Sequence, residues 1–438
     1  MGPAGIVPRR AVLAGGVGAA AAASFGLLEA RGPADRRELP LYSETVALGE
    51  AGARTPVPVG RADLLVEGTR VLRTDRYPAR LVHAEAEFLG SAAAWTREPG
   101  RWSGITRTAL LDLRVLTHGL PATVAGWTSP WRYVWPRDCA HVAVALARCG
   151  FLDEGVAQLH FLQEVQGADG WFEARYDAST RRSPDRRPRQ FDDAAWALWA
   201  VSSMLDEPGA DAERVLRGLE PLVRRSASVL VDNLGPDGLP PATPDYWELP
   251  TDVLTLGIAA PVWAGLSHAF RLLDVLGDHA GADRVGVAAD AVSRVVSERF
   301  GVTGYGRELG GRALDASVAF LFPPYAVYAP SAPVRAALDR AEAALQRPAG
   351  GLAPGEDWRA DGVSWTPQTA LFALVHAQDG EVERATRLLE WLDRHRTEAG
   401  SLPEKVLHDG RPASVAPLAW TAALTLLTVS AVQGSDEA

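Results

Sequence analysis

The chain has 438 residues, of which 47% are hydrophobic, and this composition is typical of a globular protein with a large core. Its formal net charge of −10 repels polyanions, so nucleic acid is excluded as a partner and a neutral substrate is favoured. Cys139 and Cys149 would lie about 15 Å apart on one helix, which excludes a disulfide between them.

The first 30 residues have the pattern of an export signal. Arg9 and Arg10 precede a weakly apolar run over 11–28 that is rich in Ala and Gly. Paired arginines before a mild hydrophobic stretch are typical of twin-arginine signals, which carry folded proteins across a membrane. We therefore expect an exported protein, attached to the membrane only if residues 1–30 are retained as an anchor.

Residues 31–103 carry scattered Pro and Gly with short alternating stretches, and they predict a linker or a reduced β-rich region. From residue 104 onward apolar residues recur at helical spacing, and Gly, Pro or Asp clusters end each segment. The expected helices are 104–117, 138–150, 152–166, 190–206, 210–232, 253–276, 280–299, 313–322, 331–345, 366–379, 381–397 and 415–432.

These twelve helices predict an all-α fold, an (α/α)6 toroid over 104–438. Most of them come in pairs joined by short turns, and those over 253–276 and 417–429 are apolar around most of their circumference. A helix of that kind is buried on more than one side, as in an inner ring sheltered by an outer ring. We interpret both apolar stretches as core helices and expect a monomer.

Five long loops are rich in aromatic and acidic residues and are expected to form a cleft at one end of such a toroid: 126–137, 167–189, 233–251, 351–363 and 398–417. Indole rings stack on the apolar faces of pyranoses, while carboxylates and arginines bind sugar hydroxyls. The cleft therefore predicts an oligosaccharide or polysaccharide as substrate. The basic run 181–189 is interpreted as solvated charge, with the cleft rim as the alternative.

Hydrolysis of a glycosidic bond takes two carboxyl groups on opposite sides of it. Glu248 follows Trp247, whose ring can desolvate the carboxyl group and keep it protonated. Glu404 lies after Pro403 in a loop just before the last expected helix. A third segment, 131–138, crowds aromatic rings, arginines and Asp138 at the start of a helix.

Three of these segments, 131–138, 245–248 and 400–404, resemble the conserved motifs of glycoside hydrolase family 15, the glucoamylase family, in the same order along the chain. Weaker matches lie at 190–192 and 314–317, so the resemblance spans roughly 104–432. It implies an (α/α)6 fold and an inverting, exo-acting hydrolase of α-linked glucosides, with Glu248 as the acid and Glu404 as the base. It further implies a sugar-binding role for Arg137, Asp138, Trp135, Trp247, Tyr133, Asp192, Arg359 and Trp365.

The chain departs from the family pattern in two places. Leu249 stands where relatives often carry a second acid, and the arginine loop before the fifth hairpin is matched only by 358–361. An α,α-trehalase or a phosphorylase on the same fold, and a carbohydrate-binding protein without turnover, remain alternatives. The histidines show no metal-ligand spacing and no nucleotide fingerprint is convincing, so we expect neither a metal nor a cofactor.

Overall fold

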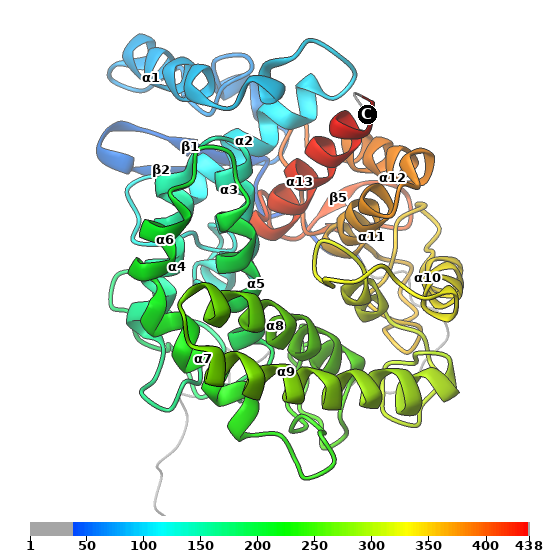
Figure 1. Ribbon diagram of the computed structural model, residues 1–438. Helices are drawn as coiled ribbons and strands as arrows, with labels where there is room; N and C mark the ends of the chain where they lie inside the picture. The colour runs from blue at the N-terminus through cyan, green and yellow to red at the C-terminus, as the bar shows by residue number, and fades with distance from the viewer. Residues whose placement is uncertain (1–37, 437–438) are drawn as a thin grey trace, which may run out of the picture. The chain divides into compact units, whose positions relative to one another are not determined.

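The structure is a computed structural model that describes residues 38–436, so the expected export signal over 1–30 lies outside the described residues. Six segments form an inner ring in which each packs on the next and the last packs on the first (Figure 1). They are α3 (Pro136–Arg148), α5 (Asp193–Leu205), α8 (Leu256–Val275), η8 (Ala316–Leu321), α11 (Thr366–Gln378) and α13 (Ala419–Asp436).

An outer helix precedes or follows each inner segment and covers it from outside. The outer helices are α2 (Ser103–Thr117), α4 (Leu152–Val165), α7 (Glu220–Asp232), α9 (His279–Arg294), α10 (Ala332–Leu345) and α12 (Val382–Arg394). The predicted all-α (α/α)6 toroid is therefore confirmed.

Two inner helices are buried around almost their whole circumference, as expected for an inner ring. Every residue of α3 from Pro136 to Ala147 is buried, and so is every residue of α11 from Thr366 to Ala377. Gly265 on α8 faces Ala195 on α5, and a Cβ on this glycine would lie only 2.6 Å from the alanine. Small residues thus set the close spacing of the ring.

Helix α8 is long and apolar enough to cross a membrane by length and composition, but 72% of its apolar window is buried inside the protein. It packs between α5 and α9, as a core helix does. The segment 253–270 therefore lies in the core, as expected.

The sequence prediction was wrong for the helix over 313–322. This segment is the six-residue 3-10 helix η8, which begins when Asp315 accepts a hydrogen bond from the amide of Ser317 (2.9 Å). Pro323 and Pro324 follow at once. Proline lacks the amide hydrogen that an α-helix needs and disfavours helical geometry in the residue before it, so the segment cannot continue as an α-helix.

Two other expected helices are interrupted. The segment 210–232 divides into α6 (Ala212–Gly218) and α7 because Pro221 lies in the first turn of a new helix. In the segment 280–299, helix α9 ends at Arg294, and the chain continues as a π-helical turn over Val295–Phe300.

Residues 38–103 contain a two-stranded antiparallel hairpin, β1 (Thr45–Leu48) with β2 (Arg54–Val57), and the helix α1 (Pro78–Ser91), which the sequence reading did not predict. The same region contains short 3-10 helices over Glu50–Gly52, Ala62–Leu64 and Ala94–Arg97. Two more lie further along the chain, over Ser129–Trp131 and Gly301–Thr303.

A small antiparallel sheet joins two loops that lead into inner helices. Strand β4 (Lys405–Val406) lies between β3 (Ser364–Trp365) and β5 (Pro412–Ala413), and Trp365 pairs with Lys405. The loop before α11 and the loop before α13 are thereby held side by side. Cys139 and Cys149 are both free and buried.

Candidate active site

The candidate site residues lie at or just before the N-termini of the inner helices. Each of the five aromatic and acidic loops leads into the start of one inner helix, namely α3, α5, α8, α11 or α13. Backbone amides at a helix N-terminus carry partial positive charge and favour polar or anionic groups nearby. A sixth connection, which leads into η8, was not among the predicted cleft loops, although the weaker motif match at 314–317 includes its Asp315; it also carries Arg307.

Glu248 lies in a tight turn before α8. Its backbone amide donates to the carbonyl of Asp245 (2.8 Å), and its φ of 55° is in the left-handed region, which is uncommon outside glycine. The side chain is only 9% exposed and forms an ion pair with Arg187. One arginine of the run 181–189 therefore lies at the site, whereas Arg182 and Arg186 are exposed.

A buried arginine organises the turn that carries Glu248. Arg307 forms two ion-pair contacts with the carboxylate of Asp245 (2.8 and 2.9 Å) and one with Asp315 (3.3 Å). Its guanidinium lies 3.6 Å from the ring centroid of Trp247. Burial disfavours the charge of Arg307, but the two aspartates outweigh it and raise the pKa of the guanidinium. Motif reading missed Arg307 because no local pattern marks it.

Gly355 allows Trp247 to approach this cluster. A Cβ on the glycine would lie 2.4 Å from the Trp247 ring and 2.8 Å from a carboxylate oxygen of Asp315. The hydroxyl of Tyr246 donates to the other oxygen of Asp315 (2.7 Å). The turn around Glu248 is therefore fixed by a hydrogen-bonded frame rather than left as an open loop.

Glu404 is buried at the edge of the small sheet, immediately before β4. One carboxylate oxygen accepts a hydrogen bond from the indole of Trp131 (3.3 Å), and the other accepts one from the hydroxyl of Ser414 (2.6 Å). The ammonium of Lys405, the only lysine in the chain, lies 3.1 Å from that second oxygen. All three neighbours are donors, so this carboxylate is placed as an acceptor.

A chain of aromatic contacts runs from the turn that carries Glu248 to strand β4, which follows Glu404. Trp247 packs edge-on against Trp358 (4.7 Å between centroids), and Trp358 packs edge-on against Trp365 (5.5 Å). The ammonium of Lys405 lies 4.2 Å from the centroid of Trp365. The structure thus brings both candidate glutamates to the same end of the ring. Arg359 lies beside this chain, half-buried, with its guanidinium 5.9 Å from the Trp358 ring.

Arg137 and Asp138 occupy the first turn of α3 and are both buried. Arg137 donates to the side-chain oxygen of Gln190 (3.2 Å), contacts Asp138 (3.4 Å), and lies over the ring of Trp420 (4.9 Å). Burial raises the pKa of Asp138 to about 6, although the charge of Arg137 opposes the shift.

His141 contacts the first turn of α3 through one ring nitrogen and Tyr325 through the other. Its Nδ1 lies 2.8 Å from the carbonyl oxygen of Arg137, and its Nε2 lies 3.1 Å from the hydroxyl of Tyr325. Burial lowers the pKa of His141 to about 3, so the ring is neutral at ordinary pH. A neutral ring that donates from Nδ1 and accepts at Nε2 satisfies both contacts.

Asp192 and Asp193 open α5 beside the same site. Asp192 accepts a hydrogen bond from the indole of Trp196 (2.8 Å) through one oxygen, and its other oxygen has no hydrogen-bond partner within the described residues. Burial raises the pKa of both aspartates above the ordinary value. Asp193 was not singled out from the sequence.

Tyr133 and Trp135 form one wall with an arginine between them. The guanidinium of Arg175 lies 4.3 Å from the ring centroid of Tyr133 and 5.2 Å from that of Trp135. Arg175 also forms an ion pair with Asp185 (2.5 Å), and Asp185 contacts Arg187 (3.2 Å). The aromatic wall is therefore linked through charged side chains to the arginine that contacts Glu248.

Several buried polar groups around the site have no hydrogen-bond partner in the part of the chain that the structure describes. Buried donors and acceptors are almost always paired in folded proteins, so such a concentration indicates a place where a polar ligand is bound. These groups are Arg137 Nε, Asp192 Oδ1, Asp193 Oδ2 and the indole Nε1 of Trp135, Trp247, Trp358, Trp365 and Trp420.

Among residues 38–436, no group of three or more His, Cys, Asp or Glu side chains is arranged to hold a metal ion. The charged groups at the site are instead paired with one another, as in the Arg307 cluster.

No family model and no curated protein sequence matches the chain. Solved structures do match it. A glycosidase variant in complex with glucose is 19% identical with a TM-score of 0.64, over 80% of this chain and 98% of that one. A bacterial glucoamylase complexed with acarbose is 17% identical with a TM-score of 0.63, over 79% of this chain and 57% of that one. A glucoamylase from Saccharomycopsis fibuligera is 13% identical with a TM-score of 0.59, over 76% and 95%. The chain therefore shares the fold of glycosidases and glucoamylases.

Proposed function

We propose that the protein is an inverting glycoside hydrolase that releases glucose from the non-reducing end of α-linked glucosides. The observation that carries the proposal is that a chain of tryptophans links the turn of Glu248, which is partly buried, to the buried Glu404 at one end of the ring. Support also comes from two proteins of the same fold, whose structures hold glucose and acarbose.

In this mechanism Glu248 protonates the glycosidic oxygen while the bond to the anomeric carbon lengthens. Glu404 takes a proton from a water molecule on the opposite face of the sugar, and that water attacks the anomeric carbon. Inversion needs room for the water, which corresponds to a separation of about 6.5–9.5 Å between the two carboxyl groups. Donation requires a neutral Glu248, so the ion pair with Arg187 must open when the substrate binds.

Arg137 and Asp138 are proposed to bind the hydroxyls of the terminal sugar, with the rings of Trp135 and Trp247 lining the same subsite. Fixing the sugar at the start of α3 turns binding energy into orientation of the reacting bond. Arg187, which pairs with Glu248, and Arg359, which lies beside the Trp358 ring, are proposed to bind the leaving-group side of the substrate.

Hydrolysis is tested with protein lacking residues 1–30, incubated with maltose, isomaltose, trehalose and soluble α-glucan. The proposal predicts glucose release from at least one of them, and its loss in Glu248→Gln and Glu404→Gln without loss of sugar binding. Binding without turnover by the unaltered protein would support a carbohydrate-binding protein instead. Absence of both turnover and binding would refute the proposal.

Phosphorolysis is a second candidate because Lys405 places a cation beside Glu404 (3.1 Å). A phosphorylase would form glucose 1-phosphate only when phosphate is added, and Glu404→Gln would retain that reaction. Hydrolysis predicts the same rate with and without phosphate.

We also propose that residues 1–30 direct export through the twin-arginine route. Replacing both Arg9 and Arg10 by Lys should leave the protein in the cytoplasm of a host that otherwise exports it. Unchanged export would refute the assignment.

A further inference from the structure

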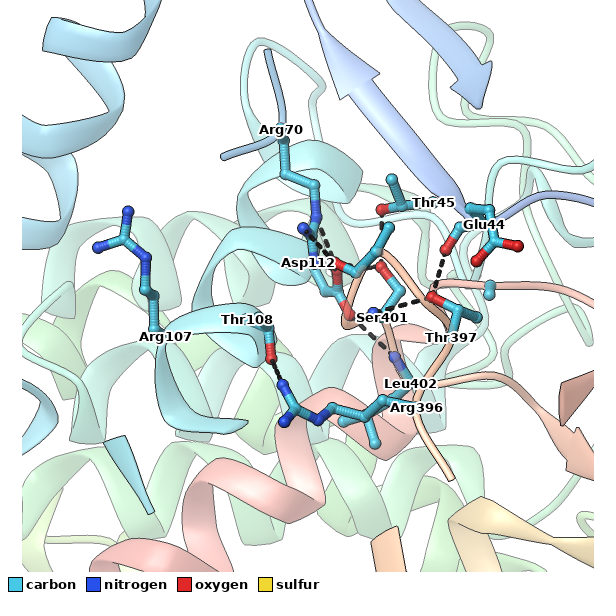
Figure 2. A network of polar contacts seen from close by, with 12 residues as sticks. Glu44, Thr45, Arg70, Arg107, Thr108, Asp112, Arg396, Thr397, Ser401 and Leu402 are labelled. Carbon is cyan, nitrogen blue, oxygen red and sulfur yellow. Dashed lines mark hydrogen bonds and ion pairs between the residues drawn. The ribbon is translucent and has the colours of Figure 1, made fainter. Parts of the chain in front are cut away.

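A buried polar network contacts the loop that leads to Glu404. It joins four parts of the chain: the start of β1, the segment that carries Arg70, the outer helix α2 and the loop over 397–402 (Figure 2). Its central members are Arg70, Asp112 and Ser401, and none of them is more than 1% exposed. None of the three belongs to the site described above.

Asp112 is the hub of this network. One carboxylate oxygen lies 2.8 Å from Nη2 of Arg70 and 2.6 Å from the hydroxyl of Ser401, and the other accepts the backbone amide of Leu402 (3.1 Å). The hydroxyls of Ser401 and Thr45 lie 2.6 Å apart. Figure 2 shows Arg70, Ser401 and Leu402 around the aspartate, with Thr45 beside Ser401.

Most of the remaining contacts of the network go to the same loop. Arg70 donates from Nη1 to the carbonyl of Ala399 (2.9 Å). The backbone carbonyl of Glu44 accepts a hydrogen bond from the hydroxyl of Thr397 (2.6 Å), and the carboxylate of Glu44 accepts one from the backbone amide of Glu398 (3.0 Å). The loop from 397 to 402 is thus held at three backbone groups and one side-chain hydroxyl by residues that lie more than 280 positions away in the chain.

Leu402 is two residues before Glu404, and the loop between them contains neither helix nor strand. The Glu404 carboxylate has donors of its own, but its approach to the sugar depends on where this backbone lies. A displacement of about 1 Å at a reacting group can cost about 100-fold in rate. A buried ion pair is in itself weak evidence of a stabilising role, since its desolvation offsets its attraction.

We propose that Asp112 and Arg70 are positioning residues for Glu404, which makes the segment before α1 a working part of the active site. Asp112 acts by fixing the amide of Leu402 and the hydroxyl of Ser401, and Arg70 by fixing the carbonyl of Ala399 and the charge of Asp112. This inference rests on the assignment of Glu404 as the base.

The test compares Asp112→Asn and Ser401→Ala with a matched control. Asparagine has the shape of aspartate but lacks the charge that Arg70 needs, whereas Ser401→Ala removes one hydroxyl and keeps the ion pair. The control is Glu207→Gln, because Glu207 is equally buried and pairs with Arg148 (2.8 Å) at the C-terminal end of α3, the end opposite to the site.

Asp112→Asn should lower kcat on the order of 100-fold with KM changed by less than about threefold, and Ser401→Ala should lower kcat less. In a Glu404→Gln background the Asp112→Asn change should lower the residual rate by less than about twofold, because both act through one group. Hydrogen exchange at the amides of 397–406 should speed up in Asp112→Asn but not in Glu207→Gln.

Three results would overturn the proposal: an equal fall in kcat in the Glu207→Gln control, additive losses in the double variant, or unchanged exchange over 397–406. If Asp112→Asn does not fold, Ser401→Ala decides through kcat and exchange. If the unaltered protein hydrolyses no glycoside, the proposed function fails while the exchange measurement still decides whether Asp112 holds the loop.

Discussion

Asp138 makes the stability of the protein depend on pH in a direction opposite to that of most aspartates. Its pKa is raised from 3.8 to about 6 by burial, so folding favours its protonated form. The contribution of Asp138 to the free energy of unfolding should therefore fall as pH rises from about 4 to about 6. Above about pH 6 this contribution should be constant. A shift of about 2 units corresponds to about 3 kcal/mol over the interval.

Asp138→Asn removes the titrating group and keeps its shape. Urea unfolding of both proteins at intervals from pH 4 to pH 7 gives two curves of stability against pH. Loss of the Arg137 contact shifts the Asn curve, and Asp192 and Asp193 still titrate in both proteins. The difference between the curves should change by about 3 kcal/mol in favour of Asn as pH rises.

Asp409 provides a control of opposite sign. It is exposed, and its hydrogen bond with Arg411 lowers its pKa, so its stabilising contribution is present above the ordinary pKa of an aspartate and is lost as pH falls. The stability difference between the unaltered protein and Asp409→Asn should therefore stay constant towards neutral pH and shrink only at acid pH. Parallel curves for the unaltered protein and Asp138→Asn would refute the reasoning, because they would show that Asp138 titrates alike in the folded and unfolded chain.

Three further changes have defined outcomes. Arg307→Met leaves the buried carboxylates of Asp245 and Asp315 without their cation, so urea unfolding should show a loss of about 3–5 kcal/mol, and a smaller loss when Asp315→Asn is added; a loss below about 1 kcal/mol would contradict the arrangement. Trp131→Phe removes the indole donor to Glu404, so kcat should fall about tenfold with KM nearly constant, and a change in KM alone would assign Trp131 to sugar binding. Burial raises the pKa of the Cys139 and Cys149 thiols, so neither should react with a thiol reagent before unfolding, and rapid modification of the folded protein would contradict their burial.

The ring of helices could be predicted from the sequence because apolar residues recur at helical spacing and Gly, Pro or Asp clusters end the segments. The segment 366–379, for example, differs from α11 by one residue at its end. The exceptions also have local causes. Two prolines after Phe322 reduce the segment 313–322 to η8, and α1 was missed because only Glu85 and Leu89 of its residues are buried, which leaves a weak apolar period.

The candidate site was predictable only where its residues stand together in the chain. Trp247 and Glu248 are neighbours, and so are Arg137 and Asp138, so motifs reveal them. Arg187 contacts Glu248 across 61 positions, and Arg307 contacts Asp245 across 62. Such contacts arise from the closure of the ring, and no spacing in the sequence encodes them. The network around Asp112 was missed for the same reason, because its partners are scattered from Thr45 to Leu402.

The central claim is that Glu248 and Glu404 act as an acid and a base on opposite faces of an α-glucoside. Proton NMR of the first turnovers on a substrate found in the oligosaccharide panel tests it most directly, because the anomer released by the enzyme is visible before mutarotation. The proposed mechanism predicts β-glucose as the first product, and only a small residual rate from Glu248→Gln or Glu404→Gln. Initial α-glucose would show retention and contradict the assignment of Glu404 as a base that activates water.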